Sequence, residues 1–298
     1  HGGLNDGYQG TRIAPIPQGG GAGDLGVHFG GYVPGITDDI NFVQISTLGN
    51  ANDFGNLITA RRNFGGHGGS QRGLNGGGNA ANAPNNTLIN SIEYITFSHK
   101  GNAADFGNLT TTGQVQTALS NSIRYITSGG QVPSATDIID YVVIATLGNA
   151  SDFGDLVDDT SDKGAGLAST TRGVVLGGEA APESTNVIQY VTIASAGNAT
   201  DFGDLTEVKK AGGGVSSSTR GIAAGGANSG GYVNIIDYIT IASTGDAQDF
   251  GDLTVARVTD GGSNSIRGIF LGGYSGSFLN TIDYVTIAST GDAADFGD

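Results

Sequence analysis

The chain has 298 residues, including 54 glycines and 6 prolines, and it contains no cysteine, methionine or tryptophan. Its formal net charge is −15 at pH 7, which argues against binding nucleic acid or an anionic membrane through a basic patch. Without cysteine there is no thiol nucleophile and no cysteine-ligated metal. No apolar run approaches the roughly 18–20 residues of a membrane-spanning helix.

One phrase organises the chain, and its last copy runs from Thr281 to Asp298. The phrase occurs six times with substitutions, and each copy holds the tripeptide Asp-Phe-Gly. The tripeptides are 46–52 residues apart and begin at Asp53, Asp105, Asp152, Asp201, Asp249 and Asp295. Repeats with a period of roughly 40–50 residues are typical of propellers and solenoids.

The first unit opens with an irregular stretch, His1 to Gly23. Within it, Arg12 to Pro17 is expected to be an edge segment, because proline cannot donate to a sheet ladder. Val27 to Tyr32 and Ile40 to Thr47 are predicted to be the second and third strands. The segment that begins at Asp53 is predicted to be the fourth.

The later units repeat the same order of signals. A glycine- and serine-rich first strand precedes a strand that begins with arginine and carries a glycine doublet; a variable loop follows, then a β-branched and aromatic strand, a tight turn and Asp-Phe-Gly. The predicted second strands are Arg72 to Gly78, Arg124 to Gly130, Arg172 to Gly178, Arg220 to Gly226 and Arg267 to Tyr274. No segment keeps helical spacing for more than one or two turns.

These elements predict an all-β fold, a six-bladed β-propeller with four antiparallel strands per blade. The whole chain, 1–298, is taken as one domain. Its blades are assigned to residues 12–58, 59–110, 111–157, 158–206, 207–254 and 255–298, and residues 1–11 to a closure segment. Because the sixth unit stops inside its last strand, His1 to Arg12 is expected to pair beside the strand near Phe296.

Two side-chain patterns are expected to serve the packing of blades. The phenylalanine of each Asp-Phe-Gly is predicted to fill the gap between neighbouring blades. The arginine that opens the second strand recurs in five units, at Arg72, Arg124, Arg172, Arg220 and Arg267. It is expected to pair with an aspartate or a backbone carbonyl of a neighbouring blade, with a ligand face as the alternative.

The order of signals resembles the kelch repeat, with a glycine doublet ending the second strand and an aromatic residue in the third. Phenylalanine stands where kelch units carry tryptophan, so the fold is expected to be kelch-like. The long phrase Ile-Asp-Tyr to Asp-Phe-Gly also resembles repeats in structural proteins of tailed phages of cyanobacteria. This resemblance covers nearly the whole chain and implies a virion structural or tail-fibre protein.

The repeated turn residues offer the clearest chemical pattern. Asparagine or aspartate pairs recur before each fourth strand, and Asp249, Asp252, Asp295 and Asp298 are candidate ligands for Ca²⁺. Tight-turn formation by asparagine, aspartate and glycine is the favoured interpretation. Asp-Phe-Gly is interpreted as a blade motif, because the other kinase signals are absent. The four histidines fall at different places in the repeat, so neither a metal nor a cofactor is expected.

Variable loops on the opposite face carry the aromatic residues Tyr32, Tyr232, Tyr274 and Phe278, which can stack on sugar rings. We expect a non-enzymatic virion or extracellular protein that displays these loops to a host surface, a glycan or other virion subunits. One alternative is a secreted carbohydrate-active enzyme, which needs two carboxylates about 5–10 Å apart in one pocket. A weaker alternative is a kelch-type module that binds other proteins.

Overall fold

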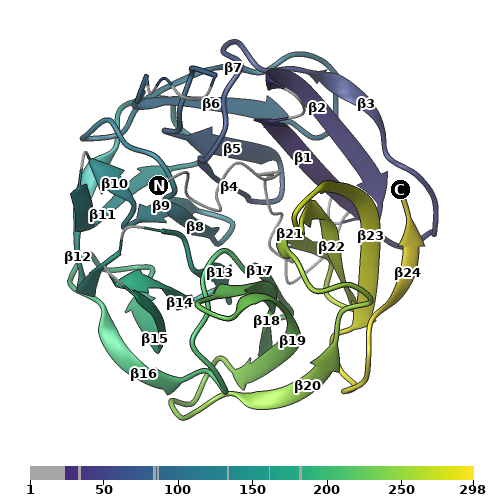
Figure 1. Ribbon diagram of the computed structural model, residues 1–298. Helices are drawn as coiled ribbons and strands as arrows, with labels where there is room; N and C mark the ends of the chain where they lie inside the picture. The colour runs from purple at the N-terminus through teal and green to yellow at the C-terminus, as the bar shows by residue number, and fades with distance from the viewer. Residues whose placement is uncertain are drawn as a thin grey trace.

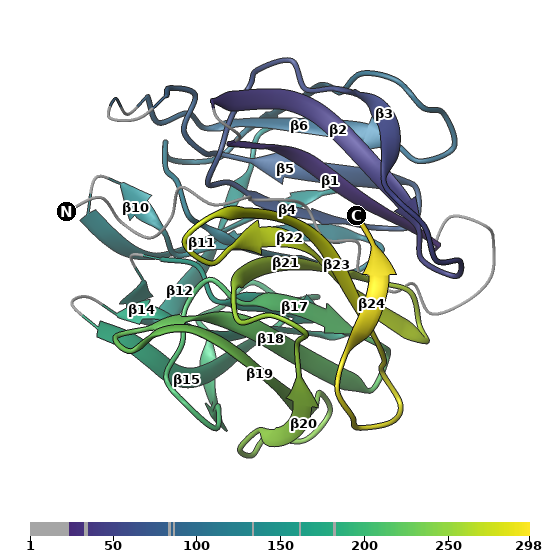
Figure 2. The same cartoon turned by 45° about the vertical axis from the view of Figure 1, so that its right-hand side comes forward.

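The computed structural model describes residues 24–32, 35–82, 85, 87–132, 134–160, 162–180 and 183–298. Every regular element within these ranges is a β-strand, so none of the described residues forms a helix that could cross a membrane. The strands form six antiparallel sheets. Figures 1 and 2 show the sheets arranged as blades around a common axis. The prediction of an all-β, six-bladed propeller is confirmed.

Strands β1 to β12 form the first three blades. Blade 1 has β1 (Leu25–Tyr32), β2 (Ile36–Gln44) and β3 (Asn52–Asn56). Blade 2 has β4 (Gly65–Gly68), β5 (Arg72–Gly76), β6 (Ser91–Thr96) and β7 (Ala104–Asn108). Blade 3 has β8 (Thr117–Ser120), β9 (Arg124–Ser128), the short β10 (Gln131–Val132), β11 (Ser134–Val143) and β12 (Ser151–Thr160).

Strands β13 to β24 form the other three blades. Blade 4 has β13 (Ala165–Ala168), β14 (Arg172–Ala180), β15 (Glu183–Thr192) and β16 (Thr200–Asp204). Blade 5 has β17 (Gly213–Ser216), β18 (Arg220–Asn228), β19 (Gly231–Thr240) and β20 (Gln248–Asp252). Blade 6 has β21 (Val258–Ser263), β22 (Arg267–Tyr274), β23 (Phe278–Thr286) and β24 (Ala294–Gly297).

Within a blade the long strands pair in chain order, from the inner edge of the ring to its rim, and in blade 3 the short β10 pairs only with the start of β11. Blade 1 shows three strands in the described part of the chain, and its predicted inner strand falls before residue 24. The expected pairing of His1 to Arg12 beside Phe296 likewise lies outside the described residues. The described residues close the ring by another contact, since Gly49 N donates to Phe296 O and Ala51 N to Asp298 O.

Each hydrophobic cluster joins two neighbouring blades. The six phenylalanines of the Asp-Phe-Gly motif are only 2–3% exposed, as expected for side chains between blades. In blade 5, Phe250 packs with Ile236 of its own blade and with Val285 and Ile287 of blade 6. Burying one such ring contributes roughly 1.5–3 kcal/mol. Since the core is shared in this way, blades stabilise one another rather than themselves alone.

The glycine doublet makes a β-bulge in the second strand. In blade 4 the pairing of β14 with β15 shifts between Leu176 and Gly178, and Gly177 has φ +65°, which favours glycine. Gly178 N then donates to Lys209 O in the linker to the next blade at 2.9 Å. The variable loop lies at the hairpin tip beyond the bulge, so the bend at the glycine doublet determines the position of that loop.

Candidate functional site

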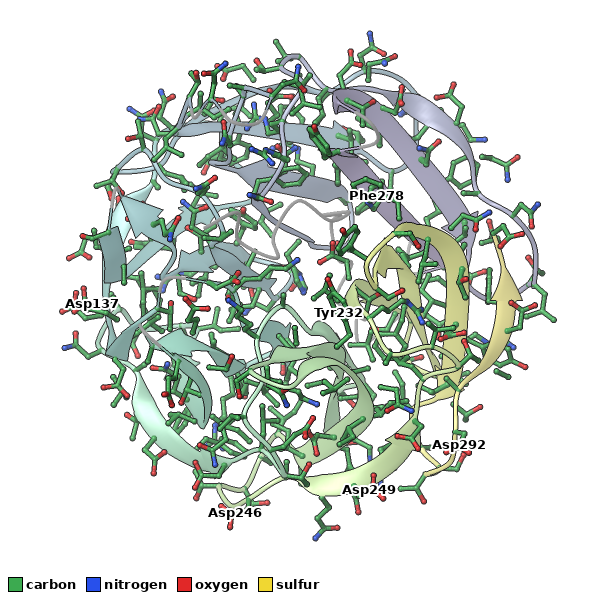
Figure 3. The ribbon with its side chains drawn as sticks, viewed as in Figure 1. Asp137, Tyr232, Asp246, Asp249, Phe278 and Asp292 are labelled. Atoms are coloured by element: carbon green, nitrogen blue, oxygen red, sulfur yellow. The ribbon has the colours of Figure 1, made fainter. Side chains whose placement is uncertain are left out.

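Four aromatic side chains form one row across blades 5, 6 and 1, which we call the aromatic row. Ring centroids are 5.9 Å apart for Tyr232 and Tyr274, 5.2 Å for Tyr274 and Phe278, and 6.1 Å for Phe278 and Tyr32. All four rings are half-buried. Figure 3 shows Tyr232 and Phe278 turned toward the middle of the ring of blades. The structure therefore brings together all four aromatic residues that the sequence singled out.

The row stands on the tips of the hairpins between second and third strands. Tyr274 ends β22 and Phe278 begins β23, and the two are direct partners in the antiparallel register. Tyr32 ends β1, and Tyr232 lies near the start of β19. Because all these hairpins open on the same face, ring closure places residues from both ends of the chain beside each other.

The electrostatics of the aromatic row are simple. Burial, followed by the neighbouring Tyr274, raises the pKa of Tyr232, so its hydroxyl stays neutral at physiological pH. At the other end, the buried guanidinium of Arg62 lies 5.2 Å from the centre of the Tyr32 ring. No signal in the sequence points to Arg62, because its contact with Tyr32 of the neighbouring blade depends on the three-dimensional fold.

This arrangement suits recognition of a molecule with apolar faces. The rings meet at interplanar angles of 47–76°, so they bind one another by tilted and edge contacts and still leave surface to solvent. Such contacts also hold three blades together, which gives the row a structural role. A half-buried aromatic strip with three phenol hydroxyls can pack against a ring and donate hydrogen bonds to its substituents.

The acidic turn residues lie at the rim, where they connect neighbouring blades. Between blades 4 and 5, Gly245 N donates to Phe202 O at 2.7 Å and Ala247 N to Asp204 O at 2.8 Å. In return Asp204 N donates to Asp246 Oδ1 at 3.1 Å. We call this set of three hydrogen bonds the rim clasp. Its side-chain acceptor recurs at every interface, at Asn50, Asn102, Asn149, Asn198, Asp246 and Asp292.

The candidate Ca²⁺ ligands Asp249, Asp252, Asp295 and Asp298 are all exposed. Figure 3 places Asp249 and Asp292 at the outer edge of the ring. No group of three or more histidines, aspartates and glutamates gathers around a point among the described residues. The calcium interpretation therefore stays a prediction. The neighbouring turn carboxylates of Asp246 and Asp292 accept hydrogen bonds from the backbone of the preceding blade.

The five arginines that open the second strands all contact the following blade. Arg172 Nη1 donates to Ile241 O at 2.8 Å, and its guanidinium lies 4.2 Å from the centre of the Tyr190 ring in its own blade. The same donation recurs from Arg72, Arg124, Arg220 and Arg267. The predicted structural partner is thus a backbone carbonyl of the neighbouring blade. In blade 1, Leu25 replaces the arginine, and Lys100 of blade 2 lies 3.9 Å from the Phe42 ring instead.

Charged groups also meet at the inner edges of the blades. Lys163 of blade 4 and Asp260 of blade 6 form a buried ion pair at 2.5 Å. Burial lowers the pKa of the nearby His28 to about 4, with opposing smaller effects of Asp260 and Lys163. Two acids that do not recur in the other units, Glu179 and Glu183, are the candidates for the carbohydrate-active alternative, and they are separate from this group: Glu179 pairs with Lys210, and Glu183 is exposed.

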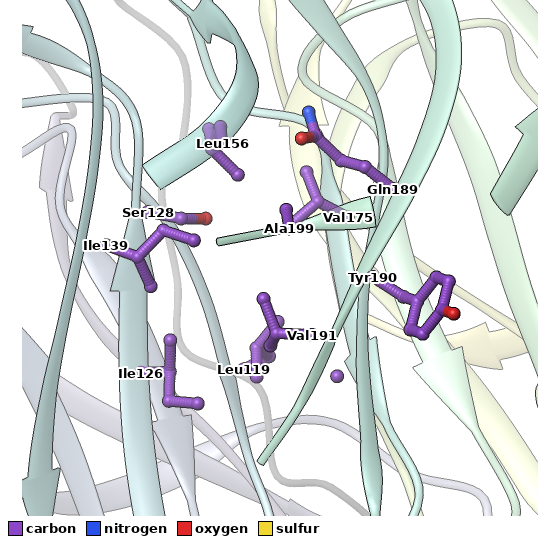
Figure 4. Close-up of a pocket in the computed structure, with 11 residues that line it drawn as sticks. Leu119, Ile126, Ser128, Ile139, Leu156, Val175, Gln189, Tyr190, Val191 and Ala199 are labelled. Atoms are coloured by element: carbon purple, nitrogen blue, oxygen red, sulfur yellow. The ribbon is translucent and has the colours of Figure 1, made fainter. Parts of the chain in front are cut away.

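A small apolar cavity lies between blades 3 and 4 (Figure 4). Leu119, Ile126 and Ile139 line it from blade 3, and Val175 and Val191 from blade 4. Its volume of about 10 Å³ is that of a packing gap and leaves no room for an organic ligand. This cavity therefore adds no second candidate site.

Comparison with known proteins leaves the assignment at the level of the fold. No family model matches the sequence, and no curated protein matches it. The architecture defines the chain as a six-bladed β-propeller whose most distinctive surface feature is the aromatic row.

Proposed function

We propose that the protein is a non-enzymatic virion structural or tail-fibre protein that binds a glycan on a host surface through the aromatic row. The observation that supports the proposal is the convergence of Tyr32, Tyr232, Tyr274 and Phe278 on one face. A rigid ring with loops of variable sequence is a common way to build a binding surface. The kelch-like order of signals and the phage-like phrase support the virion setting.

The chemistry of the row favours a neutral sugar. The faces of its rings match the C–H faces of a pyranose. The chain as a whole carries a net charge of −15, which repels sulfated or sialylated glycans at a distance. The tyrosine hydroxyls provide donors for the hydroxyl groups of the sugar.

An array of defined neutral and acidic glycans, followed by calorimetry on the glycans that bind, tests this function. We expect binding of neutral glycans, and a loss of about tenfold in affinity, about 1.4 kcal/mol, in Tyr232→Ala and in Phe278→Ala. Leu147→Ala is the control, because Leu147 is 57% exposed in a turn far from the row in sequence and blade. Unchanged affinity in both aromatic variants contradicts the proposal.

Two other outcomes separate the remaining functions. Binding to isolated virion subunits but to no glycan assigns the row to assembly of the particle rather than to attachment. Release of reducing sugar from a bound glycan contradicts the non-enzymatic assignment. In that case Glu179→Gln and Glu183→Gln identify whether either acid takes part.

A further inference from the structure

In three blades, a cationic side chain from the linker that enters the blade pairs with an acid of the third strand. Both partners are buried, and the acid also accepts hydrogen bonds from the start of the linker. In blade 6, for example, Arg257 Nη1 lies 2.8 Å from Asp283 Oδ2, and Thr254 Oγ1 donates to Asp283 Oδ1 at 2.7 Å. The three pairs are Arg61 with Glu93, Lys209 with Asp237 and Arg257 with Asp283.

One backbone hydrogen bond marks the equivalent linker position in every blade from 2 to 6. The second glycine of the doublet in the preceding blade donates its N–H to the carbonyl of this linker residue. The linker residues of blades 2 to 6 are, in order, Arg61, Gly113, Thr160, Lys209 and Arg257. In blade 4 both charges are missing, because Thr160 stands at the linker position and Gln189 at the position of the acid. In blade 3 the cation alone is missing, because Gly113 stands at the linker position and Asp140 at the position of the acid.

Asp140 is therefore a buried acid without the cation that its counterparts have. Its side chain is 3% exposed, and its described partner is Thr110, whose N–H and hydroxyl donate to it at 2.8 Å. Burial raises the pKa of Asp140, and Thr110 opposes this effect only in part. A buried carboxylate is costly unless a positive charge or a proton neutralises it.

A cavity of about 10 Å³ lies beside Asp140, at the place where the other blades hold their cationic group. The guanidinium of Arg257 donates to the carbonyls of Val255, Phe270 and Gly272. The same positions in blade 3 are Thr111, Thr127 and Gly129, and all three line the cavity together with Thr136, Ile138 and Gln116.

Gln116, which lines this cavity and a second one near Lys163 and Asp260, carries an unsatisfied buried oxygen. Its side chain is 5% exposed, and its Oε1 accepts no hydrogen bond from any residue in the described part of the chain. A buried amide oxygen without a donor is rare in a folded protein. A cation in the cavity is one partner that could satisfy this oxygen.

We propose that blade 3 binds a monovalent cation, potassium, sodium or ammonium, in the cavity beside Asp140. The ion takes the place of the guanidinium or ammonium group that the chain itself supplies in blades 2, 5 and 6. Besides the apolar Leu109 and Ile138, the cavity is lined by residues that carry oxygen atoms, which suit a hard cation: the Asp140 carboxylate, the Gln116 amide and three threonines. Asp140 is the single acid among the lining residues, so one positive charge balances the site.

Thermal unfolding in chloride salts of equal concentration tests the proposal. We expect Tm to be about 2–4 °C higher in potassium or sodium chloride than in N-methylglucamine chloride, whose cation is too large for the cavity. Asp140→Asn removes the charge and is expected to remove the difference between salts. Gly113→Lys supplies a tethered ammonium, as Lys209 does in blade 5, and is expected to raise Tm in N-methylglucamine chloride and abolish the salt effect.

Gly113→Gln is the matched control, because it adds a side chain of similar length without charge. Gly113 is not among the glycines with a positive φ, so its backbone angle does not disfavour either substitution. Diffraction from crystals grown with rubidium or thallium is expected to show an anomalous peak beside Asp140. Equal Tm in all salts, together with a Cγ chemical shift of a protonated Asp140 at pH 7, would overturn the proposal, since a proton would then neutralise the acid.

Discussion

Replacing Gly203 by alanine tests whether close backbone contact at the rim holds the blades together. Gly203 lies in β16 with φ +144°, a conformation that residues with a Cβ rarely adopt. A Cβ built at Gly203 lies 2.5 Å from the carbonyl carbon of Gly245 and 2.9 Å from Asp246 N. Since both obstacles are backbone atoms, the turn of blade 5 has to move away from blade 4.

That movement breaks the rim clasp between blades 4 and 5. A strained backbone costs about 1–3 kcal/mol, and each of the three hydrogen bonds contributes roughly 0.5–1.5 kcal/mol net. Gly203→Ala is therefore expected to lower the free energy of unfolding by about 2.5–7.5 kcal/mol if the clasp is lost completely. This is a large fraction of the stability of a typical domain.

Gly245→Ala is the matched control on the other side of the same interface. Gly245 has φ +148°, but a Cβ built there has no atom within 4 Å. Gly245→Ala therefore introduces backbone strain without a clash, and the expected loss in the free energy of unfolding is about 1–3 kcal/mol. Urea unfolding followed by circular dichroism gives both values. Equal losses in the two variants would refute the argument from close contact.

Three further predictions concern buried or half-buried charges. Arg172→Ala removes the bond to blade 5 and the contact with the Tyr190 ring, so we expect a loss of about 1–3 kcal/mol by thermal unfolding, smaller in Arg172→Lys. The pKa of His28 is about 4 in the folded protein and 6.5 when unfolded, so the free energy of unfolding is expected to fall as the pH drops from 6.5 to 4. His28→Gln is expected to make this pH dependence weaker. Imidazole NMR shifts measure the pKa of His28 directly. Arg257→Ala leaves Asp283 buried without its cation and is expected to cost about 3–5 kcal/mol. Adding Asp283→Asn should recover much of that loss, and no recovery would argue against an effect of the unpaired charge.

The sequence was sufficient to predict the fold because each blade repeats the same local signals. Alternation of buried and exposed residues identifies strands, and the doublet Gly177-Gly178 marks the bulge that ends the regular pairing of β14 with β15. A period near 48 residues then requires blades that bury their faces against each other. The exposed turn aspartates were likewise identifiable as turn residues, although their acceptor role toward the next blade requires the three-dimensional ring.

The candidate site was only partly predictable. Loop position and residue type point to Tyr32, Tyr232, Tyr274 and Phe278, but their convergence depends on closure of the ring, which joins Tyr32 to Phe278 from opposite ends of the chain. The partner Arg62 comes from yet another blade. The ion pairs of the linker left a clearer signal, because aligning the repeats shows cation and acid appearing together in blades 2, 5 and 6.

The shared interfaces have a consequence for how the chain assembles. Most blades offer the same acceptors on one side and the same donors on the other, so many pairs of blades would fit each other almost equally well. Repeat chains of this kind can pair modules in the wrong order. Contacts that occur only once, such as Lys100 with the Phe42 ring between blades 2 and 1 or Lys163 with Asp260 between the inner edges of blades 4 and 6, stabilise the correct order of blades over the alternatives.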